Sequence, residues 1–367
     1  MDLMNKVEAV KAEIKDEYCL PHQRPWLIGF SGGKDSTLML QLVVESLLEL
    51  PWSVRKRQVH VVANDTLVES PIVAAYVDKI LSKISAAVDS LNLPICVQKT
   101  VPDPGNTFWV NVIGRGYPPP TRLFRWCTDR MKIRPTTAYI RQCVDAAGEV
   151  ILLLGVRRSE SSARARTASR YDNGERLNKH NDIHGCLVFR PILEMDTEDV
   201  WNVLAESDAP WGGDHKHLIE LYSNAAGDDC PLVMDPDAAP SCGSSSVRFG
   251  CWTCTVVEKD RSFRASVDNG YEQLGPMVDF RDWMKDYCYR DECRMKTRRN
   301  GEVGKGPLTF SAREEVLNRL LELQARVGVS LISEDEQRRI QRIWIEDQAD
   351  MALRGADKLL SMLTFGG

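Results

Sequence analysis

The stretch Phe30-Ser31-Gly32-Gly33-Lys34-Asp35-Ser36 decides the fold, because it joins two apolar runs of different length. The run 26–30 has the length of a buried strand, and the run 37–48 is typical of a largely buried helix. A strand that passes through a Ser/Gly turn into a helix points unpaired backbone N–H groups, and the positive end of the helix dipole, at one place. The stretch therefore predicts an anion-binding loop.

The residue types of this loop suit a phosphate. Glycines let the backbone approach an anion without a Cβ in the way, serines add hydroxyl donors, and lysine adds a positive charge. The loop is not of the Walker type, because the G-x-x-x-x-G-K-[ST] spacing is missing. The predicted nucleotide-binding residues of the loop are Ser31, Gly32, Gly33, Lys34, Asp35 and Ser36.

The order Ser-Gly-Gly-Lys-Asp-Ser resembles the signature of the PP-loop ATP pyrophosphatases. The resemblance implies ATP as a ligand, held by its pyrophosphate end together with Mg²⁺. It also implies transfer of AMP to a substrate oxygen with release of pyrophosphate. The alternative is an incidental Ser/Gly turn after a strand, and a match of six consecutive residues between a strand and a helix argues against it.

The composition bounds the class of protein. A chain of 367 residues with 43% hydrophobic residues can form two domains, or one α/β domain with additions. The net charge of −5 gives no overall attraction to nucleic acid, so a contact with DNA or RNA must come from a local basic patch or a partner. The run Cys288 to Arg299 is one candidate patch, with a solvated loop as an equal alternative. There is no long apolar run and no signal peptide, so we expect a cytoplasmic protein with no membrane contact.

Apolar runs alternate with helical segments, the pattern of an α/β domain with a parallel sheet. Further strands are expected at residues 58–65, 95–100, 149–156 and 187–192, and helices at 2–18 and 71–91. The capping patterns Ser311-x-x-Glu314 and Ser333-x-x-Glu336 predict later helix starts. The fold class is α/β: a doubly wound, mostly parallel sheet of the PP-loop, adenine nucleotide alpha hydrolase-like type, with a Cys-rich insertion and a helical C-terminal region.

The expected division is a leading helix, a PP-loop ATP pyrophosphatase domain, a Cys-rich iron–sulfur region and C-terminal helices, at residues 1–20, 21–225, 226–300 and 301–367. Two segments interrupt the alternation of strands and helices. Residues 107–120 combine aromatics, glycines and three prolines, so we expect a surface loop over the site. Residues 165–185 are polar and predict a mobile loop that substrate could order.

Charged side chains follow two of the expected strands. Ligands of doubly wound sheets bind beyond the carboxyl ends of strands, which places Asp65 near the loop as a contact to nucleotide or Mg²⁺. An Asx turn or a helix cap is the alternative for this residue. Arg157 and Arg164 follow the strand 149–156, in a pattern that resembles the sulfate-nucleotide reductase branch, where such arginines meet phosphate oxygens. A solvated helix start is the alternative.

Cys127 stands among five cations between residues 122 and 134. Cationic neighbours lower the pKa of a thiol and favour the thiolate, which is the reactive and metal-binding form. We therefore predict a functional thiol, with a buried structural cysteine beside a solvated basic face as the alternative. Lys132 and Arg134 could neutralise phosphates.

Eleven cysteines, an odd number in a large chain without a secretion signal, argue against a disulfide framework and for metal or thiol chemistry. The spacing C-x₁₁-C-x₈-C-x₂-C gathers four thiols in roughly two dozen residues, which suits zinc or an iron–sulfur cluster. By spacing alone, zinc is the more frequent outcome. The predicted metal ligands are Cys230, Cys242, Cys251 and Cys254, with Cys127 as persulfide carrier; a set that uses Cys127 and omits Cys230 is the main rival.

From about residue 15 to 300 the chain resembles the DndC/SspD-like proteins of DNA phosphorothioation systems. The resemblance rests on the loop and on the strings DTLVESP (65–71), NTFWVN (106–111), FRWCT (124–128), PWGGD (210–214) and RFGCWTCTVVEKD (248–260). It implies an ATP pyrophosphatase with a [4Fe–4S] cluster that replaces a non-bridging DNA phosphate oxygen with sulfur. The implied partners are DNA, a cysteine desulfurase as sulfur donor and other phosphorothioation-system proteins.

On this interpretation the phosphate oxygen of DNA attacks the α-phosphorus of ATP, and Lys34, Arg157 and Arg164 stabilise the developing charge. A sulfur species on the cluster or on Cys127 then displaces AMP. The expected catalytic residues are Lys34, Asp35, Cys127 and Arg157.

Three other functions compete. A sulfate-nucleotide reductase shares the loop and the arginines, but it should carry a nucleophilic cysteine in a C-terminal Glu-Cys-Gly-x-His motif, and nothing after Cys293 supplies one. A tRNA thiolase shares the loop and cluster chemistry, but the string Phe-Gly-Cys-Trp-x-Cys-Thr does not resemble it. A non-catalytic, zinc-stabilised scaffold that binds ATP or DNA would release no pyrophosphate.

Overall fold

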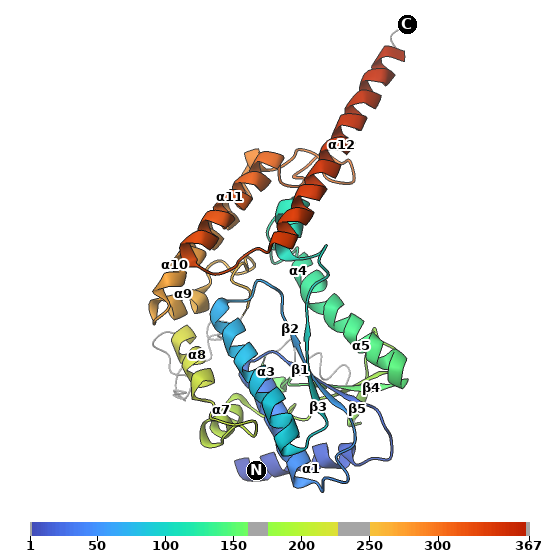
Figure 1. The fold of residues 1–367 in the computed structure, drawn as a ribbon, viewed down its shortest axis with the longest axis vertical. Coiled ribbons are helices and arrows are strands. Elements are labelled where there is room, and N and C mark those ends of the chain that lie inside the picture. Colours follow the sequence, from blue (N-terminus) through green and yellow to red (C-terminus); the bar gives the residue numbers. More distant parts are fainter. Residues whose placement is uncertain (1, 161–174, 227–249, 365–367) are drawn as a thin grey trace.

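The computed structural model describes residues 2–160, 175–226 and 250–364. Its centre is a six-stranded sheet with the strand order β3-β2-β1-β4-β6-β5 (Figure 1). Neighbouring strands are parallel, apart from the antiparallel pair β5 and β6. The strands are β1 (Trp26–Phe30), β2 (Val59–Asn64), β3 (Ile95–Thr100), β4 (Val150–Leu154), β5 (Leu177–Lys179) and β6 (Cys186–Phe189). The predicted α/β class with a mostly parallel sheet is confirmed.

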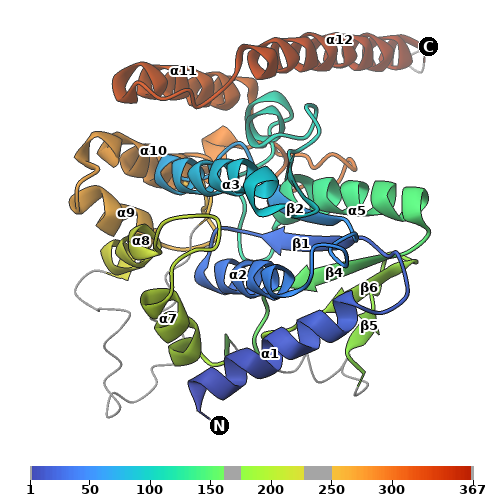
Figure 2. The same cartoon turned by 60° about the horizontal axis from the view of Figure 1, so that its bottom comes forward.

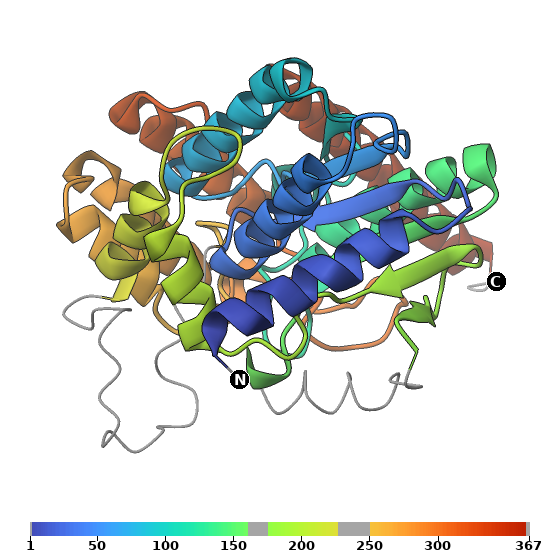
Figure 3. The same ribbon diagram turned by 90° about the horizontal axis from the view of Figure 1, so that it is seen from below.

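Helices cover both faces of the sheet, as a doubly wound fold requires. The side chains of β1 alternate between the faces: Trp26 and Ile28 join the main core, whereas Leu27 joins a second, smaller core with Ile140 of α5. Helices α1, α2 and α3 lie on the first face and α5 on the other (Figures 2 and 3). Their bounds are α1 (Leu3–Tyr18), α2 (Lys34–Glu49), α3 (Pro71–Leu91) and α5 (Arg134–Ala147).

The strand order reverses beside β1, because the chain runs outward through β2 and β3 and then returns to β4 on the other side of β1. In open α/β sheets the crevice at such a reversal, beyond the carboxyl ends of the strands, is where ligands bind. The Ser/Gly loop follows β1 directly and therefore lies at this place. A Cβ built on Gly155, just after β4, would come within 2.8 Å of the Asp35 carbonyl oxygen, so the loop packs tightly on the neighbouring strand end.

The second half of the chain adds helices. Two of them, α11 and α12, form an outer layer beyond α3 and α10 (Figure 2), and α12 extends away from the body (Figure 1). The helices are α7 (Thr197–Glu206), α8 (Lys216–Ala226), α9 (Arg261–Asp268), α10 (Gly275–Tyr287), α11 (Phe310–Val327) and α12 (Glu334–Thr364). Short helical turns lie at Val110–Gly114, Trp126–Thr128 (α4), Asp129–Ile133, Arg158–Glu160, Glu272–Leu274 and Asp291–Cys293.

The prediction of a surface loop at residues 107–120 is wrong for its first half, which is buried. Trp109 is fully buried, and its Nε1 donates to the carbonyl of Leu331 at 2.7 Å. Trp344 of α12 donates to the carbonyl of Ile113 at 2.8 Å. Aromatic and branched side chains in this segment supply the apolar surface on which the C-terminal helices pack, so a segment too irregular to form a long element still forms core.

Most helices and strands begin and end near the residues that the sequence predicts, but the start of α11 and the presence of β5 need correction. The Ser333 capping box at the start of α12 is confirmed, because Glu336 N donates to Ser333 Oγ at 3.2 Å and Ser333 N donates to the Glu336 carboxylate at 2.9 Å. For α11 the cap is Thr309 rather than Ser311, since Thr309 Oγ1 accepts from Ala312 N. Strand β5 lies in a segment predicted as loop. Among the described residues, no helix is long and apolar enough to span a bilayer.

Candidate nucleotide and cysteine site

The Ser/Gly loop has the backbone geometry of an anion cradle. Gly33 is the N-cap of α2, so the first amides of that helix open onto the loop. Gly32 has a φ of +73°, and a Cβ built there would lie 2.5 Å from Val77 Cγ2 on α3. Only glycine fits this position without strain, which explains one residue of the loop from the structure itself.

The two serines brace the loop. Ser31 N donates to Ser36 Oγ at 3.2 Å, and Ser36 Oγ lies 3.0 Å from the Gly33 carbonyl, to which it donates. The two hydroxyl oxygens are 3.1 Å apart. Ser36 is buried, whereas Ser31 is exposed. Of the two hydroxyls that the sequence predicts as phosphate donors, Ser31 is therefore the more accessible, and Ser36 holds the shape of the turn.

Tyr222 of α8 belongs to this loop, and sequence reasoning missed it. The Lys34 amide donates to the Tyr222 hydroxyl at 3.3 Å, and Lys34 Nζ lies 5.4 Å from the centre of the tyrosine ring. Burial raises the pKa of Tyr222, so its hydroxyl stays protonated. No sequence signal marks this residue, because it lies 188 positions away from Lys34.

Arg157 binds the loop through Asp35. Its Nε donates to Asp35 Oδ1 at 2.7 Å, and one terminal nitrogen donates to Ser159 Oγ at 2.8 Å and to Thr197 Oγ1 at 3.2 Å. The Arg157 side chain is only 1% exposed. Asp35 also lies 3.3 Å from Lys34 Nζ. The structure thus brings together three of the four predicted catalytic residues, with Asp35 between two cations.

The other predicted nucleotide contacts are placed as follows. Asp65 forms an Asx turn, because its Oδ1 accepts from Leu67 N at 2.8 Å, and its Oδ2 lies 3.1 Å from Lys99 Nζ. The structural alternative for Asp65 is therefore present, and its contact with nucleotide or Mg²⁺ stays a prediction. Arg164 lies outside the described residues. Arg158 pairs with Glu194 at 2.6 Å near the surface.

Backbone pairing brings the C-x₂-C turn to the carboxyl end of β2. Glu69 and Cys251 form an isolated antiparallel bridge, and Trp252 N donates to the carbonyl of Val68 at 3.0 Å. Cys254 N donates to the Cys251 carbonyl at 3.0 Å, which closes the turn. Since β2 neighbours β1, these thiols and the Ser/Gly loop lie at the same edge of the sheet.

Polar groups surround the Cys251 thiol. Thr66 Oγ1 lies 3.2 Å from its sulfur and donates to the Glu69 carboxylate at 2.9 Å. Burial raises the pKa of Cys251 to about 12, and the Glu69 charge acts in the same direction. Lys132 Nζ lies 3.6 Å from that carboxylate. Burial lowers the pKa of Lys132, but Cys251 and Glu69 offset this and raise it overall, so the lysine stays charged beside the thiol.

The prediction that cations lower the pKa of Cys127 is wrong. Burial raises the pKa of this thiol, and the neighbouring Cys254 raises it further. The cations do not reverse this, because Arg130 and Arg134 are hydrogen-bonded to other polar side chains. The charge of Cys254 acts on both Cys127 and Cys251, and the hydrogen bond from Thr255 Oγ1 to the Pro120 carbonyl at 2.6 Å joins the segments that carry Cys254 and Cys127.

These three cysteines, Cys127, Cys251 and Cys254, are called the thiol trio below. In the part of the chain that the structure describes, no three His, Cys, Asp or Glu side chains close around a single point that could hold one metal ion. A zinc ion needs every thiolate within about 2.3 Å of one centre, whereas an iron–sulfur cluster spreads its thiolates over several irons. A metal ion or a cluster on these thiols stays a prediction. The predicted ligands Cys230 and Cys242 lie outside the described residues.

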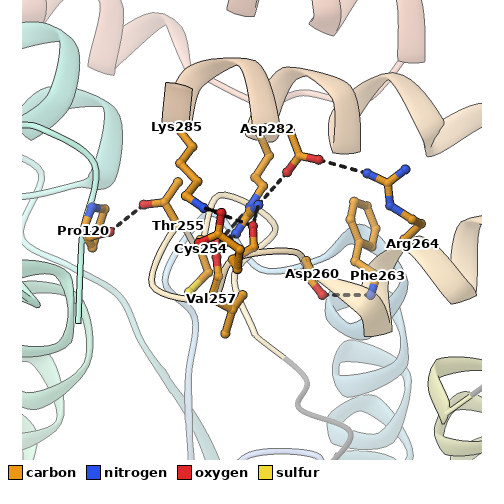
Figure 4. Close-up of polar contacts among 11 residues, drawn as sticks. Pro120, Cys254, Thr255, Val257, Asp260, Phe263, Arg264, Asp282 and Lys285 are labelled. Carbon is orange, nitrogen blue, oxygen red and sulfur yellow. Dashed lines mark hydrogen bonds and ion pairs between the residues drawn. The ribbon is translucent and has the colours of Figure 1, made fainter. Parts of the chain in front are cut away.

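Arg281 of α10 fixes the loop that carries Cys254, and sequence reasoning missed it too. Its guanidinium donates to the carbonyl of Cys254 at 2.9 and 2.8 Å, to that of Glu258 at 3.0 Å and to that of Val257. The side chain is 1% exposed. Figure 4 shows the loop from Cys254 onward beneath α10, with Asp282 and Lys285 on the helix above it. One buried cation thus satisfies the carbonyls of the loop that carries a thiol of the trio.

Comparison with known proteins adds the family. Residues 25–257, more than half of the chain, match the model described as the phosphoadenosine phosphosulfate reductase domain. The uncharacterized protein MJ0066 of Methanocaldococcus jannaschii is 25% identical over 189 residues, which cover 52% of this chain and 33% of that protein. The chain therefore matches about a third of the length of this curated relative.

Three solved structures match this chain at low similarity. A phosphoadenylyl-sulfate reductase from Candida auris has a TM-score of 0.34 and 11% identity, covering 54% of this chain and 79% of that one. A Candida glabrata FMN adenylyltransferase has a TM-score of 0.35 and 10% identity, covering 86% and 80%. The U34-tRNA thiolase NcsA of Methanococcus maripaludis, with its [4Fe-4S] cluster, has a TM-score of 0.33 and 10% identity, covering 82% and 86%. By the match of its residues 25–257, this chain belongs to the phosphoadenosine phosphosulfate reductase domain family.

Proposed function

We propose that this chain uses ATP to adenylylate a DNA backbone phosphate and then replaces one non-bridging oxygen of that phosphate with sulfur. The observation that carries the proposal is the shared edge of the sheet: the Ser/Gly loop follows β1, and the thiol trio is held at the end of the neighbouring β2. A phosphate between the two could be activated by one and receive sulfur from the other.

The loop and its cations serve the first half of the reaction. The N-terminal amides of α2, the exposed Ser31 hydroxyl and Lys34 Nζ bind the β- and γ-phosphates of ATP, together with Mg²⁺. A non-bridging oxygen of the DNA phosphate attacks the α-phosphorus, and pyrophosphate leaves. Arg157 holds the Asp35 carboxylate in place through its Nε, so that the loop presents its donors to the charge that develops on the leaving group.

The thiol trio serves the second half. A sulfur nucleophile attacks the adenylylated DNA phosphorus and expels AMP, so the original phosphate oxygen leaves with AMP. When the sulfur is carried as a persulfide of Cys127, its release needs a second thiol that forms a disulfide, and Cys254 is the neighbour that can do so. In the alternative route, a [4Fe–4S] cluster on the predicted ligands Cys230, Cys242, Cys251 and Cys254 would supply a binding place for sulfur, and its irons would favour the thiolate form that burial disfavours. Cys230 and Cys242 remain predicted ligands.

The partners follow from this chemistry. The substrate is DNA, and the sulfur comes from a cysteine desulfurase, with other phosphorothioation-system proteins completing the pathway in the cytoplasm. The net charge of −5 requires that DNA be met by a local basic surface rather than by the protein as a whole.

The test measures pyrophosphate released from ATP by anaerobically purified protein, with and without DNA. We expect DNA to stimulate release, and Lys34→Ala to lower it at least about a hundredfold, as loss of a charge-stabilising donor does. Lys56→Ala is the matched control, because Lys56 is exposed and precedes β2 at the opposite edge of the sheet. Release that needs no DNA, or that survives Lys34→Ala, contradicts the proposal.

The family match favours one second candidate, a sulfate-nucleotide reductase. That enzyme would release sulfite from a sulfate nucleotide when a thiol reductant is supplied. Sulfite formation without ATP would replace the proposal with this candidate. Pyrophosphate release without sulfite formation would exclude it.

A further inference from the structure

A short exposed turn precedes the thiol trio. In it Leu123 is 100% exposed and Phe124 is 48% exposed, between the exposed Arg122 and Arg125. Among the residues that the structure describes, this is the one place where two consecutive large apolar side chains are exposed. Cys127 follows two positions after the turn. We refer to residues 122–125 as the Arg–Phe turn.

Hydrogen bonds hold the Arg–Phe turn in shape. Phe124 N donates to the Thr121 carbonyl at 3.3 Å and lies 3.1 Å from Thr121 Oγ1, while Thr121 N donates back to the Phe124 carbonyl at 3.2 Å. This reciprocal pair closes a tight loop with Arg122 and Leu123 at its tip. The apolar side chains are therefore held outward by backbone geometry.

The irregular segment that leads into the turn is held in place at three successive prolines, residues 118–120. Their carbonyls each accept a hydrogen bond from a different part of the chain, so the base of the turn is rigid. The pairs are Trp126 Nε1 to Pro118 O at 3.0 Å, Tyr289 Oη to Pro119 O at 2.6 Å and Thr255 Oγ1 to Pro120 O at 2.6 Å. Figure 4 shows the last contact, which joins the turn directly to the loop after Cys254.

Beside the turn lies an open pocket with basic groups in its wall. It is lined by Thr121, Thr255, Lys285, Asp286, Tyr289 and Arg290. Lys285 Nζ lies 2.7 Å from the Glu258 carboxylate and lowers the pKa of that carboxyl, and the charge of Arg122 acts on it in the same direction. Lys285 is neutralised by its ion pair with Glu258, and Asp286 is the acidic group of the pocket wall, so the local basic surface consists of the exposed Arg122, Arg125 and Arg290.

We propose that the Arg–Phe turn and this pocket bind a nucleic-acid strand with one base unstacked on Phe124, so that the adjoining phosphate reaches the thiol trio. This rests on the proposed function and adds the form of its substrate. Arginine and lysine side chains bind phosphates without regard to sequence, and an exposed aromatic ring stacks on any unpaired base. Leu123, which lies next to Phe124 at the tip of the Arg–Phe turn, fills the space that the unstacked base leaves among the remaining bases.

Nucleic acid explains the pattern better than a protein partner. Protein interfaces are enriched in arginine and aromatic residues but depleted of lysine and aspartate, and both Lys285 and Asp286 line the pocket beside this turn. Sites for single strands combine cations that follow the backbone with aromatic stacking platforms. A duplex offers its bases only after unstacking, so the turn should favour a single strand or a duplex with an unpaired base.

The test uses fluorescence anisotropy of a labelled oligonucleotide, single-stranded or annealed into a duplex, with anaerobically purified full-length protein. We expect tighter binding of the single strand. Phe124→Ala should weaken it about tenfold, the loss of one stacked base, equal to about 1.4 kcal/mol, and Phe124→Trp should restore it. Trp52→Ala is the matched control, because Trp52 is 72% exposed but precedes β2 at the opposite edge of the sheet. Its binding should equal that of the wild type.

A second variant separates charge from stacking. Arg122→Ala should weaken both oligonucleotides and reduce the salt dependence of binding by about one phosphate contact, whereas Arg141→Ala on α5 should not. Equal affinity of Phe124→Ala and wild type overturns the inference while leaving the proposed function standing. A wild type that binds no oligonucleotide removes both. Loss of binding to a cysteine desulfurase in Phe124→Ala, with unchanged oligonucleotide affinity, also overturns it and makes the turn a protein contact.

Discussion

The guanidinium of Arg157 and the carboxylate of Asp35 form a buried ion pair, with Nε and Oδ1 2.7 Å apart, that joins the end of β4 to the first turn of α2. The arginine is 1% exposed and the aspartate side chain 14%. The pair therefore fixes the nucleotide loop from the neighbouring strand, and it places a buried positive charge behind the loop rather than on its open face.

Removing this arginine takes away the cation that lies 2.7 Å from the half-buried Asp35 carboxylate. We predict that Arg157→Ala lowers the free energy of unfolding by about 3 kcal/mol, as breaking one partner of a buried pair does. The matched control is Arg158→Ala, whose pair with the 73% exposed Glu194 contributes less than about 1 kcal/mol. Urea unfolding of both variants decides this. Equal losses of unfolding free energy would show that the buried pair of Arg157 and Asp35 contributes no more to stability than an exposed ion pair.

Gly32 tests the shape of the loop. Gly32→Ala must accept a φ of +73° and a Cβ within 2.5 Å of Val77, so we predict a loss of about 3 kcal/mol from strain and overpacking together. Gly328→Ala is the control, because Gly328 has a left-handed φ of +67° and nothing within 4 Å of its Cβ; it should lose only about 1 kcal/mol. Val77→Ala in the Gly32→Ala background should recover the difference. No recovery would mean that the clash with α3 is not the cause.

Arg281 tests the loop of the thiol trio, given the proposed cluster. We predict that Arg281→Ala leaves the carbonyls of Cys254, Val257 and Glu258 without their donor, and that anaerobically purified protein loses most of its iron. The control is Arg264→Ala on α9. It removes the ion pair of Arg264 with Asp282, the residue next to Arg281 on α10, and this variant should keep its iron. Iron, acid-labile sulfide and the visible spectrum are measured for both. Full iron in Arg281→Ala would show that the loop needs no such brace.

Asp260 gives a pH-dependent prediction. It is the N-cap of α9, accepting from Phe263 N at 3.0 Å, and burial raises its pKa above the usual 3.8. A raised pKa in the folded state means that the protonated carboxyl stabilises the fold relative to the ionised one. This stabilisation is complete at a pH below the unfolded-state pKa, and it is lost as the pH rises through the folded-state pKa. Asp260→Asn keeps an acceptor and removes the buried charge, so it should be more stable than wild type at neutral pH and lose that advantage in acid.

Asp260→Ala serves as the control for the cap. It removes charge and acceptor together and should lose about 1 kcal/mol relative to Asp260→Asn at every pH. Thermal unfolding across the acid range measures both variants. A constant difference between wild type and Asp260→Asn would contradict the raised pKa.

Local patterns predicted what is local. The Ser/Gly loop, the strands at 26–30 and 95–100 and the Ser333 cap are each encoded within a few neighbouring residues, and all are found. The doubly wound, mostly parallel class of the sheet also followed, because strands that alternate with helices form parallel sheets with helices on both faces.

Contacts between distant segments could not be predicted. Tyr222 reaches Lys34 across 188 residues, and Arg281 reaches Cys254 across 27. Residues 107–114 were misjudged because composition reports irregularity and not burial. The pKa of Cys127 was misjudged because the sequence shows neither its burial nor the nearby Cys254, and these raise the pKa despite the cations around the thiol.

The central claim is sulfur transfer to DNA, and the most direct measurement is sulfur in the DNA backbone. DNA incubated anaerobically with the protein, ATP, cysteine and a cysteine desulfurase is digested with nuclease and analysed by mass spectrometry for phosphorothioate dinucleotides. The account predicts such dinucleotides with wild type and none with Lys34→Ala or Cys127→Ser, while Cys127→Ser still releases pyrophosphate. Pyrophosphate release by the wild type without any sulfur-containing dinucleotide would contradict it.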